Sequence, residues 1–454
     1  MCTLCRPTLL FAPPTRVSMP PRRSARLVEL ANPHFQLPFP PNVVALFFSL
    51  LPLDARLRAR EVCRGWRFFL EDACFWTHVD LSKSCGVNPR FLFREDLALI
   101  RAACARAKGA LHALDLSGVD SLSLDEVAEL VAENGESLRA LTTPYSLELD
   151  AENVARLREA APLCVLNCLV KCDGAEAVAM MRCELVCPYY LQVDSLDTQQ
   201  QQTDFAAALA SRTGMKELYL ENGNLAGGAE LEDLSRATIA AGVERVFFLI
   251  CRLTPMALPA LTLLLRPSAL RSLSIYNDGV SLFTGPDLPA FCDALRSNSI
   301  PDQIILQKCD LWADPADAGM VLAALAARTT PFSLGLDGNR VGETQAQQFA
   351  AGTQLAQLIT AGGLEELNLN DCNLGEIGLV PIFKALSRAT RLNTLRFNNE
   401  EMSREFARDV VLPAVRANTS LRRLDLRIVP RFGVPGFGEQ LPELLEAMNI
   451  VTRR

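Results

Sequence analysis

Histidine is scarce in this sequence, with three residues among 454: His34, His78 and His112. A Ser-His-Asp or Cys-His catalytic set uses a histidine as its base, and none of these three stands in a recognisable set. The chain also lacks a P-loop, a G-x-G-x-x-G turn and a nucleophile elbow. We therefore expect a non-catalytic protein, with no catalytic residues and no cofactor.

Long apolar runs and an excess of basic charge are also missing. The apolar run from Val43 to Leu53 is far shorter than the ~20 residues that a membrane-spanning helix needs. Lys and Arg total 45 against 52 Asp and Glu, which gives a net charge of −7. A nucleic-acid-binding protein usually presents a basic face. We therefore expect neither a membrane nor a nucleic-acid partner.

Cysteines are numerous, but they lack the regular spacing of a disulfide framework. Their number, 15, is odd and the chain is long, so we expect free thiols in a reducing compartment, the cytoplasm or the nucleus. The densest group is Cys164, Cys168, Cys172, Cys183 and Cys187. A zinc site usually combines two close pairs of ligands, and this spacing differs from that pattern. Packing in a core is therefore favoured over a zinc site, and we expect no bound metal.

Residues 1–36 form a basic, proline-rich leader with no acidic residue before Glu29. This composition predicts disorder. The weakly apolar start at residues 1–11 leaves a signal or transit peptide as an alternative. Met19 is an alternative translation start.

Residues 37–81 carry more apolar bulk than a segment of this length buries by itself. A first apolar stripe at helical spacing comprises Val43, Val44, Phe47, Leu50 and Leu51, and a second comprises Val62, Trp66, Phe69 and Leu70. Two or three short helices in about 45 residues make a thin core. The surplus apolar surface therefore predicts contact with the rest of the chain, with a partner, or with both.

The same segment resembles an F-box. The resemblance rests on Leu37-Pro38, on the run from Phe47 to Pro52, on Val62-Cys63-Arg64-Gly65-Trp66-Arg67 and on Phe75-Trp76. It departs from the family at Phe39-Pro40-Pro41, where a carboxylate is usual. The resemblance implies a three-helix element that docks the Skp linker of a cullin-based ubiquitin ligase. The residues implied to bind the linker are Leu37, Pro38, Phe47, Phe48, Leu51, Pro52, Val62 and Trp66.

After Leu81 the sequence repeats the phrase L-x-x-L-x-L-x-x-N/C-x-L, the signature of leucine-rich repeats. Clear copies run from Val243 to Leu253 and from Leu364 to Leu374. About twelve copies fall within residues 82–429, on average about 28 residues apart. Their central apolar positions are Leu114, Leu141, Leu166, Leu191, Leu218, Val246, Leu273, Ile304, Leu334, Leu367, Leu395 and Leu424.

A period of about 28 residues leaves room for a full helix between successive strands, and the repeats resemble ribonuclease-inhibitor-like arrays. Helical composition at residues 124–131, 320–326 and 346–359 agrees with this interpretation. We therefore predict an α/β fold, in which a short helical F-box is followed by a leucine-rich-repeat horseshoe with a parallel concave sheet and convex helices.

Two further structural roles are predicted in the array. The resemblance implies that Cys251, Cys309 and Cys372 take the inward position where the family uses Asn or Cys to bond the backbone of the turn. Residues 430–454 are expected to form a Gly- and Pro-rich hinge and a capping helix from Pro442 to Val451.

Strand alternation places the third, fifth and seventh positions of each repeat on the concave face. Aromatic residues and Arg dominate interface hot spots, and the middle repeats put aromatic side chains on neighbouring strands. The target-binding candidates are Tyr219, Glu221, Phe247, Leu249, Tyr276, Asn368, Asn370, Arg396, Arg423 and Arg427. Packing beneath a loop, or a chance cluster of exposed apolar residues, is the alternative.

Together these features predict a substrate-recognition adaptor that binds a Skp-type linker, and through it a cullin, and presents a protein target on its repeats. The alternative is a leucine-rich-repeat scaffold or inhibitor-like binder whose F-box-like segment is only a structural cap. Exposure of Phe47, Phe48, Leu51 and Pro52 separates the two hypotheses, because burial of these residues against the first repeat would favour the cap.

Overall fold

A computed structural model describes residues 47–48, 51, 53–62, 66–67, 70–81, 95–119, 122–266, 269–297, 301–398, 402–427 and 442–452. The chain divides into two compact units, Met1–Leu147 with Arg156–Cys164 (unit 1) and Glu148–Ala155 with Val165–Arg454 (unit 2). This division falls inside the predicted repeat region and passes through the helix α7 (Ala151–Ala160).

Unit 1 joins the end of the 37–81 segment to the first repeats. Its described elements are α3 (Leu53–Val62), η1 (Ala73–Phe75), β1 (His78–Asp80), α5 (Glu95–Arg106), β2 (Ala113–Asp115), α6 (Leu124–Ala132) and β3 (Ala140–Thr142). Strands β1, β2 and β3 pair in parallel, and the register sets Val79 beside Leu114 and Leu114 beside Leu141. The 37–81 segment therefore contributes a strand to the array, which accounts for part of its surplus apolar surface.

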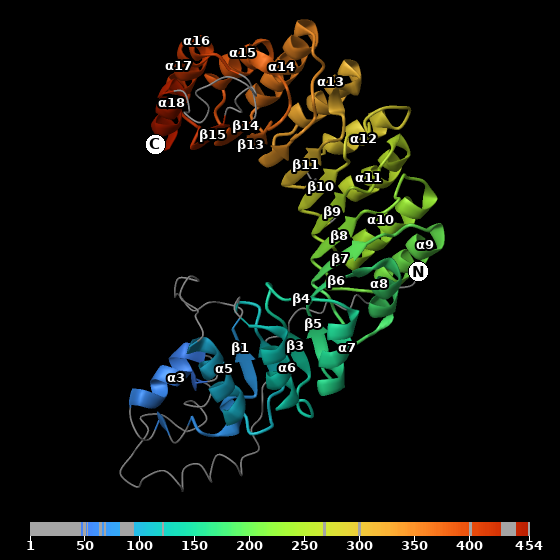
Figure 1. Ribbon diagram of the computed structural model, residues 1–454, viewed down its shortest axis with the longest axis vertical. Coiled ribbons are helices and arrows are strands. Elements are labelled where there is room, and N and C mark those ends of the chain that lie inside the picture. The colour runs from blue at the N-terminus through green and yellow to red at the C-terminus, as the bar shows by residue number, and fades with distance from the viewer. Residues whose placement is uncertain are drawn as a thin grey trace, which may run out of the picture. The chain divides into compact units, whose positions relative to one another are not determined.

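Unit 2 is built on a parallel sheet of eleven strands, in the order β15-β14-β13-β12-β11-β10-β9-β8-β7-β6-β4 (Figure 1). The strands are β4 (Glu148–Leu149), β6 (Leu169–Asp173), β7 (Tyr190–Asp194), β8 (Glu217–Glu221), β9 (Arg245–Leu249), β10 (Ser272–Tyr276), β11 (Gln303–Gln307), β12 (Phe332–Gly335), β13 (Leu364–Asn368), β14 (Thr394–Asn398) and β15 (Arg423–Arg427). Between them run helices, so strand and helix alternate along the chain. The predicted α/β class with a parallel sheet is confirmed.

The helices of unit 2 line the side of the arc opposite the sheet (Figure 1). They are α8 (Gly174–Arg182), α9 (Gln199–Ala210), α10 (Ala229–Ala241), α11 (Leu258–Leu265), α12 (Leu288–Leu295), α13 (Pro315–Ala326), α14 (Gln345–Thr360), α15 (Gly375–Leu386), α16 (Arg404–Phe406), α17 (Leu412–Ala417) and α18 (Pro442–Thr452), with short turns η3 (Pro255–Ala257), η4 (Leu311–Ala313) and the π-helical η5 (Ala407–Val411). Side-chain caps stabilise the N-termini of several of these helices. At α14, for example, Thr344 and Gln347 form a capping box. The helices predicted at 124–131, 320–326 and 346–359 correspond to α6, α13 and α14.

Alternation along each strand separates the core from the open face of the sheet. In β8 the second and fourth residues, Leu218 and Leu220, are buried, whereas Glu217, Tyr219 and Glu221 are partly exposed. We call the open side, formed by the residues that alternate with these buried ones and including Ser333 and Gly335 of β12, the sheet face. Predicted central positions from Leu191 to Leu424 all fall on strands of this sheet.

The repeats between Leu141 and Leu191 differ from the prediction. Leu166 lies on β5 (Val165–Asn167), which is not a strand of the eleven-stranded sheet. There the sheet uses β4 and β6, with Leu149 beside Val170 and Val170 beside Leu191. The weak consensus of this stretch therefore hid two strands.

A ladder of Cys and Asn side chains bonds the turns that follow the strands. The thiols of Cys251, Cys309 and Cys372 donate to Leu220 O at 3.0 Å, Gln307 O at 3.3 Å and Leu336 O at 3.3 Å, respectively. Their predicted structural role is confirmed. Asn277 and Asn339 take the corresponding place in the intervening repeats. Asn277 was not predicted, because it stands one residue earlier in its repeat than the cysteines do in theirs.

Replacing Asn339 is expected to destabilise the array strongly. Its Oδ1 accepts from the N–H groups of Cys309 at 2.9 Å and Leu311 at 3.1 Å, and its Nδ2 donates to the carbonyl oxygens of Leu306 and Leu336. Asn339→Ala leaves these buried groups without partners, and each such group costs ~1–3 kcal/mol. We expect a clear fall in the urea midpoint of unfolding. Gln357→Ala on the exposed side of α14 is the control, and equal midpoints for the two variants would contradict this role.

The predicted capping helix is present as α18. Ala447 and Val451 are buried, and α18 contacts α17 and β15. Arg404 Nε lies 2.7 Å from Glu443 Oε1, which adds an ion pair between α16 and α18. The predicted hinge before Pro442 lies outside the described residues.

Candidate interaction sites

An aromatic cluster holds together the described part of the 37–81 segment. Phe48 is fully buried, and its ring meets Trp66 edge-on at 5.2 Å between centroids and Phe75 at 6.3 Å. Trp76 is also fully buried, and its Nε1 donates to Leu70 O at 2.6 Å. Edge-to-face contacts of this kind stabilise by more than their buried area alone. This cluster fixes which neighbouring side chains point outward.

Arg56 is a buried cation that ties α3 to the end of the segment. Its Nε donates to Leu51 O at 2.9 Å, its Nη1 donates to Phe75 O, and its guanidinium lies 5.8 Å from the Trp76 ring centroid. Burial lowers the pKa of the Arg56 guanidinium, and Asp80 partly opposes this change. Sequence analysis did not find this role, because the backbone groups of Leu51 and Phe75 meet Arg56 only in the folded segment.

The structure places the predicted linker-binding residues in different environments. Phe47 and Val62 are exposed, at 55% and 65% of their surface, and Leu51 and Trp66 are half-buried. Phe48 corrects the prediction, because its ring lies inside the aromatic cluster and is closed to a partner in this structure. Leu37, Pro38 and Pro52 lie outside the described residues. Among the described side chains of this segment, the large apolar ones that are exposed are thus Phe47 and Val62.

Three aromatic rings stack across neighbouring strands on the sheet face of unit 2. Tyr219 on β8 and Phe247 on β9 are nearly parallel, with 3.8 Å between centroids and 8° between planes. Tyr190 on β7 stacks on the other side of Tyr219 at 4.5 Å. We call these three residues the aromatic stack. Tyr219 and Phe247 were predicted on this face; Tyr190 was missed because its repeat is weak in consensus.

Carboxylates surround the aromatic stack. Glu217 accepts from Arg245 Nη1 at 2.7 Å, and the Tyr219 hydroxyl donates to the same carboxylate at 3.4 Å. Burial, and after it the charges of Glu148, Glu217 and Glu221, raise the pKa of Tyr190 to about 12. The pKa of Tyr219 is raised as well, first by burial. Both phenols therefore stay protonated at neutral pH.

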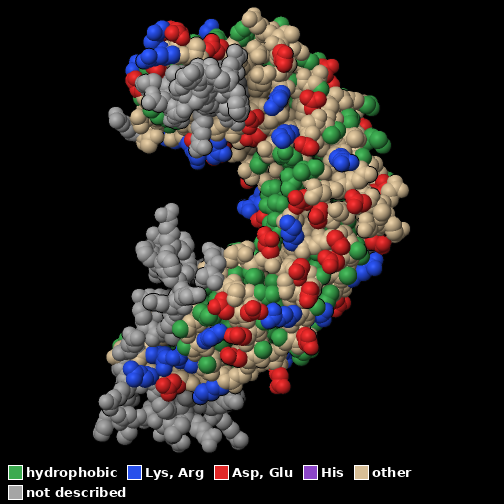
Figure 2. All heavy atoms as spheres, in the orientation of Figure 1, with side chains coloured by type: hydrophobic (Ala, Val, Ile, Leu, Met, Phe, Trp, Pro, Cys, Tyr) green, Lys and Arg blue, Asp and Glu red, His purple; other side chains and the backbone are tan. Residues whose placement is uncertain are grey.

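Leu249 and Tyr276 extend the apolar surface beyond the stack. Leu249 lies beside Glu221 on one side and Tyr276 on the other in the strand register. Lys308 Nζ lies 4.9 Å from the Tyr276 ring centroid and donates to its hydroxyl at 2.6 Å. Figure 2 shows hydrophobic and acidic side chains next to each other on the part of unit 2 that carries these strands.

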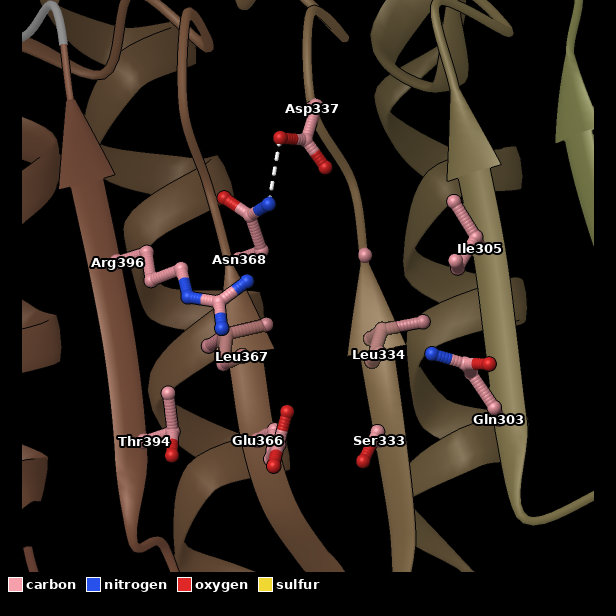
Figure 3. A pocket seen from close by; sticks show the side chains of 11 residues that line it. Gln303, Ile305, Ser333, Leu334, Asp337, Glu366, Leu367, Asn368, Thr394 and Arg396 are labelled. Carbon is pink, nitrogen blue, oxygen red and sulfur yellow. Dashed lines mark hydrogen bonds between the residues drawn. The ribbon is translucent and has the colours of Figure 1, made fainter. Parts of the chain in front are cut away.

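Farther along the sheet face, the predicted residues Asn368 and Asn370 form a polar cluster around Asp337. Both side-chain amides donate to Asp337 Oδ1, Asn368 at 2.6 Å (Figure 3) and Asn370 at 3.2 Å. Burial raises the pKa of Asp337, and these two hydrogen bonds oppose the rise. Gly335 has no side chain on this face, which leaves a shallow hollow of about 70 Å³ between Ile305 and Asn368. Both amide groups therefore already donate a hydrogen bond to Asp337, which limits what they can donate to a partner.

The predicted arginines at the end of the sheet share one acid. Arg396 Nε lies 3.4 Å and Arg423 Nε 3.0 Å from Asp425 Oδ2. Arg427 ends β15, and its side chain lies outside the described residues. Strands β11, β12 and β13 separate this group from Tyr219, Phe247 and Tyr276. The predicted target-binding residues therefore form two surfaces, one aromatic and acidic and the other polar and basic.

The dense cysteine group lies partly in the core. Cys164, Cys168 and Cys172 are buried, and burial raises the pKa of each thiol to about 12. The predicted packing role is confirmed for these three; Cys183 and Cys187 are half-buried. In the described part of the chain, no three His, Cys, Asp or Glu residues are grouped as metal ligands.

Comparison with solved structures finds low similarity. Leiomodin-1 actin-binding site 2 is 18% identical, over 43% of this chain and 86% of that one, with a TM-score of 0.24. The Rad7 and Elc1 complex in yeast is 14% identical, over 79% and 89%, with a TM-score of 0.40. The TLR13–ssRNA13 complex is 17% identical, over 70% and 36%, with a TM-score of 0.27.

Comparison at the level of sequence identifies the N-terminal segment. No curated protein matches the chain. No helix within the described ranges combines the length and apolarity needed to cross a membrane. One family model, F-box-like, matches residues 39–82, which include Phe47, Phe48 and the buried aromatic cluster. The chain therefore contains an F-box-like domain at residues 39–82.

Proposed function

We propose that this protein is the substrate-recognition adaptor of a Skp–cullin–F-box type ubiquitin ligase. The observation that carries the proposal is the F-box-like domain at residues 39–82 with Phe47 and Val62 exposed on it. Exposed large apolar side chains on a small domain favour a protein partner. In this proposal they meet a Skp-type linker, which binds a cullin in turn. The adaptor acts in the cytoplasm or the nucleus.

The adaptor itself has no catalytic role in this proposal. The F-box-like domain fixes the chain to the ligase, and the repeats, which we propose to be of the ribonuclease-inhibitor-like type, hold a target protein. Holding the target raises the effective concentration of its lysines near the conjugating enzyme. The sheet face supports this role, because its aromatic stack and its arginines are the residue types found in interface hot spots.

The competing hypothesis is a repeat scaffold in which the F-box-like domain only caps the array. Both hypotheses account for β1, whose Val79 pairs with Leu114 of the first repeat. Of the four residues that separate them, Phe47 is 55% exposed, Leu51 is half-buried and Phe48 is buried in the aromatic cluster. Pro52 lies outside the described residues. A cap has no use for a ring as exposed as that of Phe47. The exposure of Phe47 therefore favours the adaptor.

Co-expression with a Skp-type linker tests the proposal. We expect affinity-tagged wild-type chain to retain the linker and Phe47→Asp to lose at least about 90% of it, since a charge placed in an apolar interface core is left unpaired. Phe349→Asp is a matched control, because Phe349 on α14 is 54% exposed. Failure of the wild type to retain the linker, or equal loss in both variants, would overturn the adaptor role.

A further inference from the structure

The sheet face carries a row of side chains that changes from acidic to apolar across four strands. Asp194 on β7, Glu221 on β8, Leu249 on β9 and Tyr276 on β10 are direct neighbours in the strand register. Adjacent strands lie ~4.8 Å apart, so the row spans three such steps. The aromatic stack lies next to this row, two to four residues earlier along β7, β8 and β9. The four side chains thus form a row across the sheet, next to the aromatic stack.

The two carboxylates in this row have neutral partners. Glu221 accepts from the Gln192 side-chain amide, and Asp194 accepts from Asn222 Nδ2 at 3.2 Å and from the Ser195 hydroxyl at 3.1 Å. Neither forms an ion pair with any residue that the structure describes. Like charges placed side by side on paired strands repel each other. A cation brought by a partner would relieve this repulsion.

The nearby cations do not supply that neutralisation. Arg245 and Glu217 are the first residues of β9 and β8, and Arg245 Nη1 lies 2.7 Å from Glu217 Oε1. Lys308 is bound to the Tyr276 hydroxyl at the other end of the row. Lys171 on β6 is exposed and lies beside Gln192, not beside Asp194. The acidic end of the row therefore keeps an uncompensated negative charge next to exposed aromatic surface.

At the apolar end a small residue lies between two larger ones. Ser274 on β10 lies between Phe247 and Ile305 in the register, and its side chain is small. Tyr276 lies two residues after Ser274 on β10, and Leu249 is the neighbour of Tyr276 on β9. An apolar side chain placed over Ser274 would lie beside Phe247, on the side away from Tyr219.

From this distribution of charge and apolar surface we infer that the sheet face over β7 to β10 binds an extended basic segment of a target protein, with Arg or Lys side chains at Asp194 and Glu221 and an apolar side chain over Ser274. An extended chain repeats its side chains every ~6.6 Å on one face, whereas neighbouring strands lie ~4.8 Å apart, and the long side chains of Arg and Lys can span this difference. The inference deepens the proposed function, because it names the chemistry of the target that the adaptor would hold.

Fluorescence anisotropy with the full-length chain tests the inference. The probe is a fluorescein-labelled peptide that alternates arginine and serine around one central phenylalanine. We expect replacement of its arginines by glutamate to abolish binding, and replacement of its phenylalanine by alanine to weaken binding about tenfold. Attraction should fall steeply as salt is raised, since the carboxylates are near the surface.

Variants of the chain locate the site. Glu221→Gln combined with Asp194→Asn is expected to weaken binding at least about fivefold, and Tyr219→Ala about tenfold. Glu366→Gln, which removes a charge from the same face on β13, is the matched control and should stay within about twofold. Phe247→Leu keeps apolar bulk and guards against a folding defect in Tyr219→Ala. Equal loss from Glu366→Gln, or unchanged binding in the Glu221 and Tyr219 variants, would overturn the inference.

The two proposals fail separately. If the chain retains the linker but does not bind the basic peptide, only the inferred target chemistry is contradicted. If the chain binds the peptide through Glu221 and Tyr219 but retains no linker, the ligase role is contradicted and the binding surface is supported.

Discussion

Gly352→Ala is expected to lower the stability of unit 2 by about 3 kcal/mol or more. Gly352 lies where α14 crosses α15, and a Cβ on it would stand 1.9 Å from Gly378 O and 2.7 Å from Gly378 C. Both atoms are backbone atoms, so the helices themselves would have to separate. Overpacking of this kind costs ~1–3 kcal/mol even where side chains can yield. The ~1 kcal/mol by which alanine exceeds glycine in helix propensity does not offset it.

Gly319→Ala provides the comparison. Gly319 is also in a helix, α13, but a Cβ there would meet only the side chain of Gln354, at 3.0 Å. A flexible amide can move aside, so we expect Gly319→Ala to be neutral or stabilising by up to about 1 kcal/mol. Urea unfolding followed by circular dichroism measures both. Equal midpoints for the two variants would mean that α14 and α15 are not packed as closely as described.

Phe48→Ala is expected to destabilise the F-box-like domain by about 3–5 kcal/mol, while Phe47→Ala leaves its stability within about 0.5 kcal/mol. Phe48 is buried against Trp66 and Phe75, so its removal leaves a cavity. Phe47 points outward and is 55% exposed. Limited proteolysis and thermal unfolding report the stability of each variant.

The same pair is expected to separate folding from binding. Phe47→Ala should stay folded and yet lose linker retention, because its ring is removed only from the interface. Phe48→Ala should lose both, through unfolding. If Phe47→Ala retained the linker as well as wild type, the exposed ring would have no docking role, and the capping hypothesis would be favoured.

The leucine period was sufficient to place most strands, because each repeat buries its apolar residues against its neighbours and the spacing is therefore constrained. Leu218, Val246 and Leu273 were placed correctly by period alone. Alternation then put Tyr219 and Phe247 on the sheet face. Their stacking required the register between β8 and β9, which the sequence does not contain.

The errors share a physical cause. Phe47 and Phe48 are adjacent on one helix, and which of them faces inward depends on Trp66 and Phe75, which reach it from later segments. Arg56 was missed for the same reason, since its partners Leu51 and Phe75 meet it only in the fold. Long-range contacts of this kind leave no periodic signal.

The association of the purified full-length chain with a purified Skp-type linker is the most direct test of the central claim. Size-exclusion chromatography with light scattering, at equal concentrations, gives the mass of the species formed. The adaptor role predicts a complex of one chain with one linker, which Phe47→Asp abolishes and Phe349→Asp preserves. Separate elution of the two wild-type proteins, each at its own mass, would contradict it.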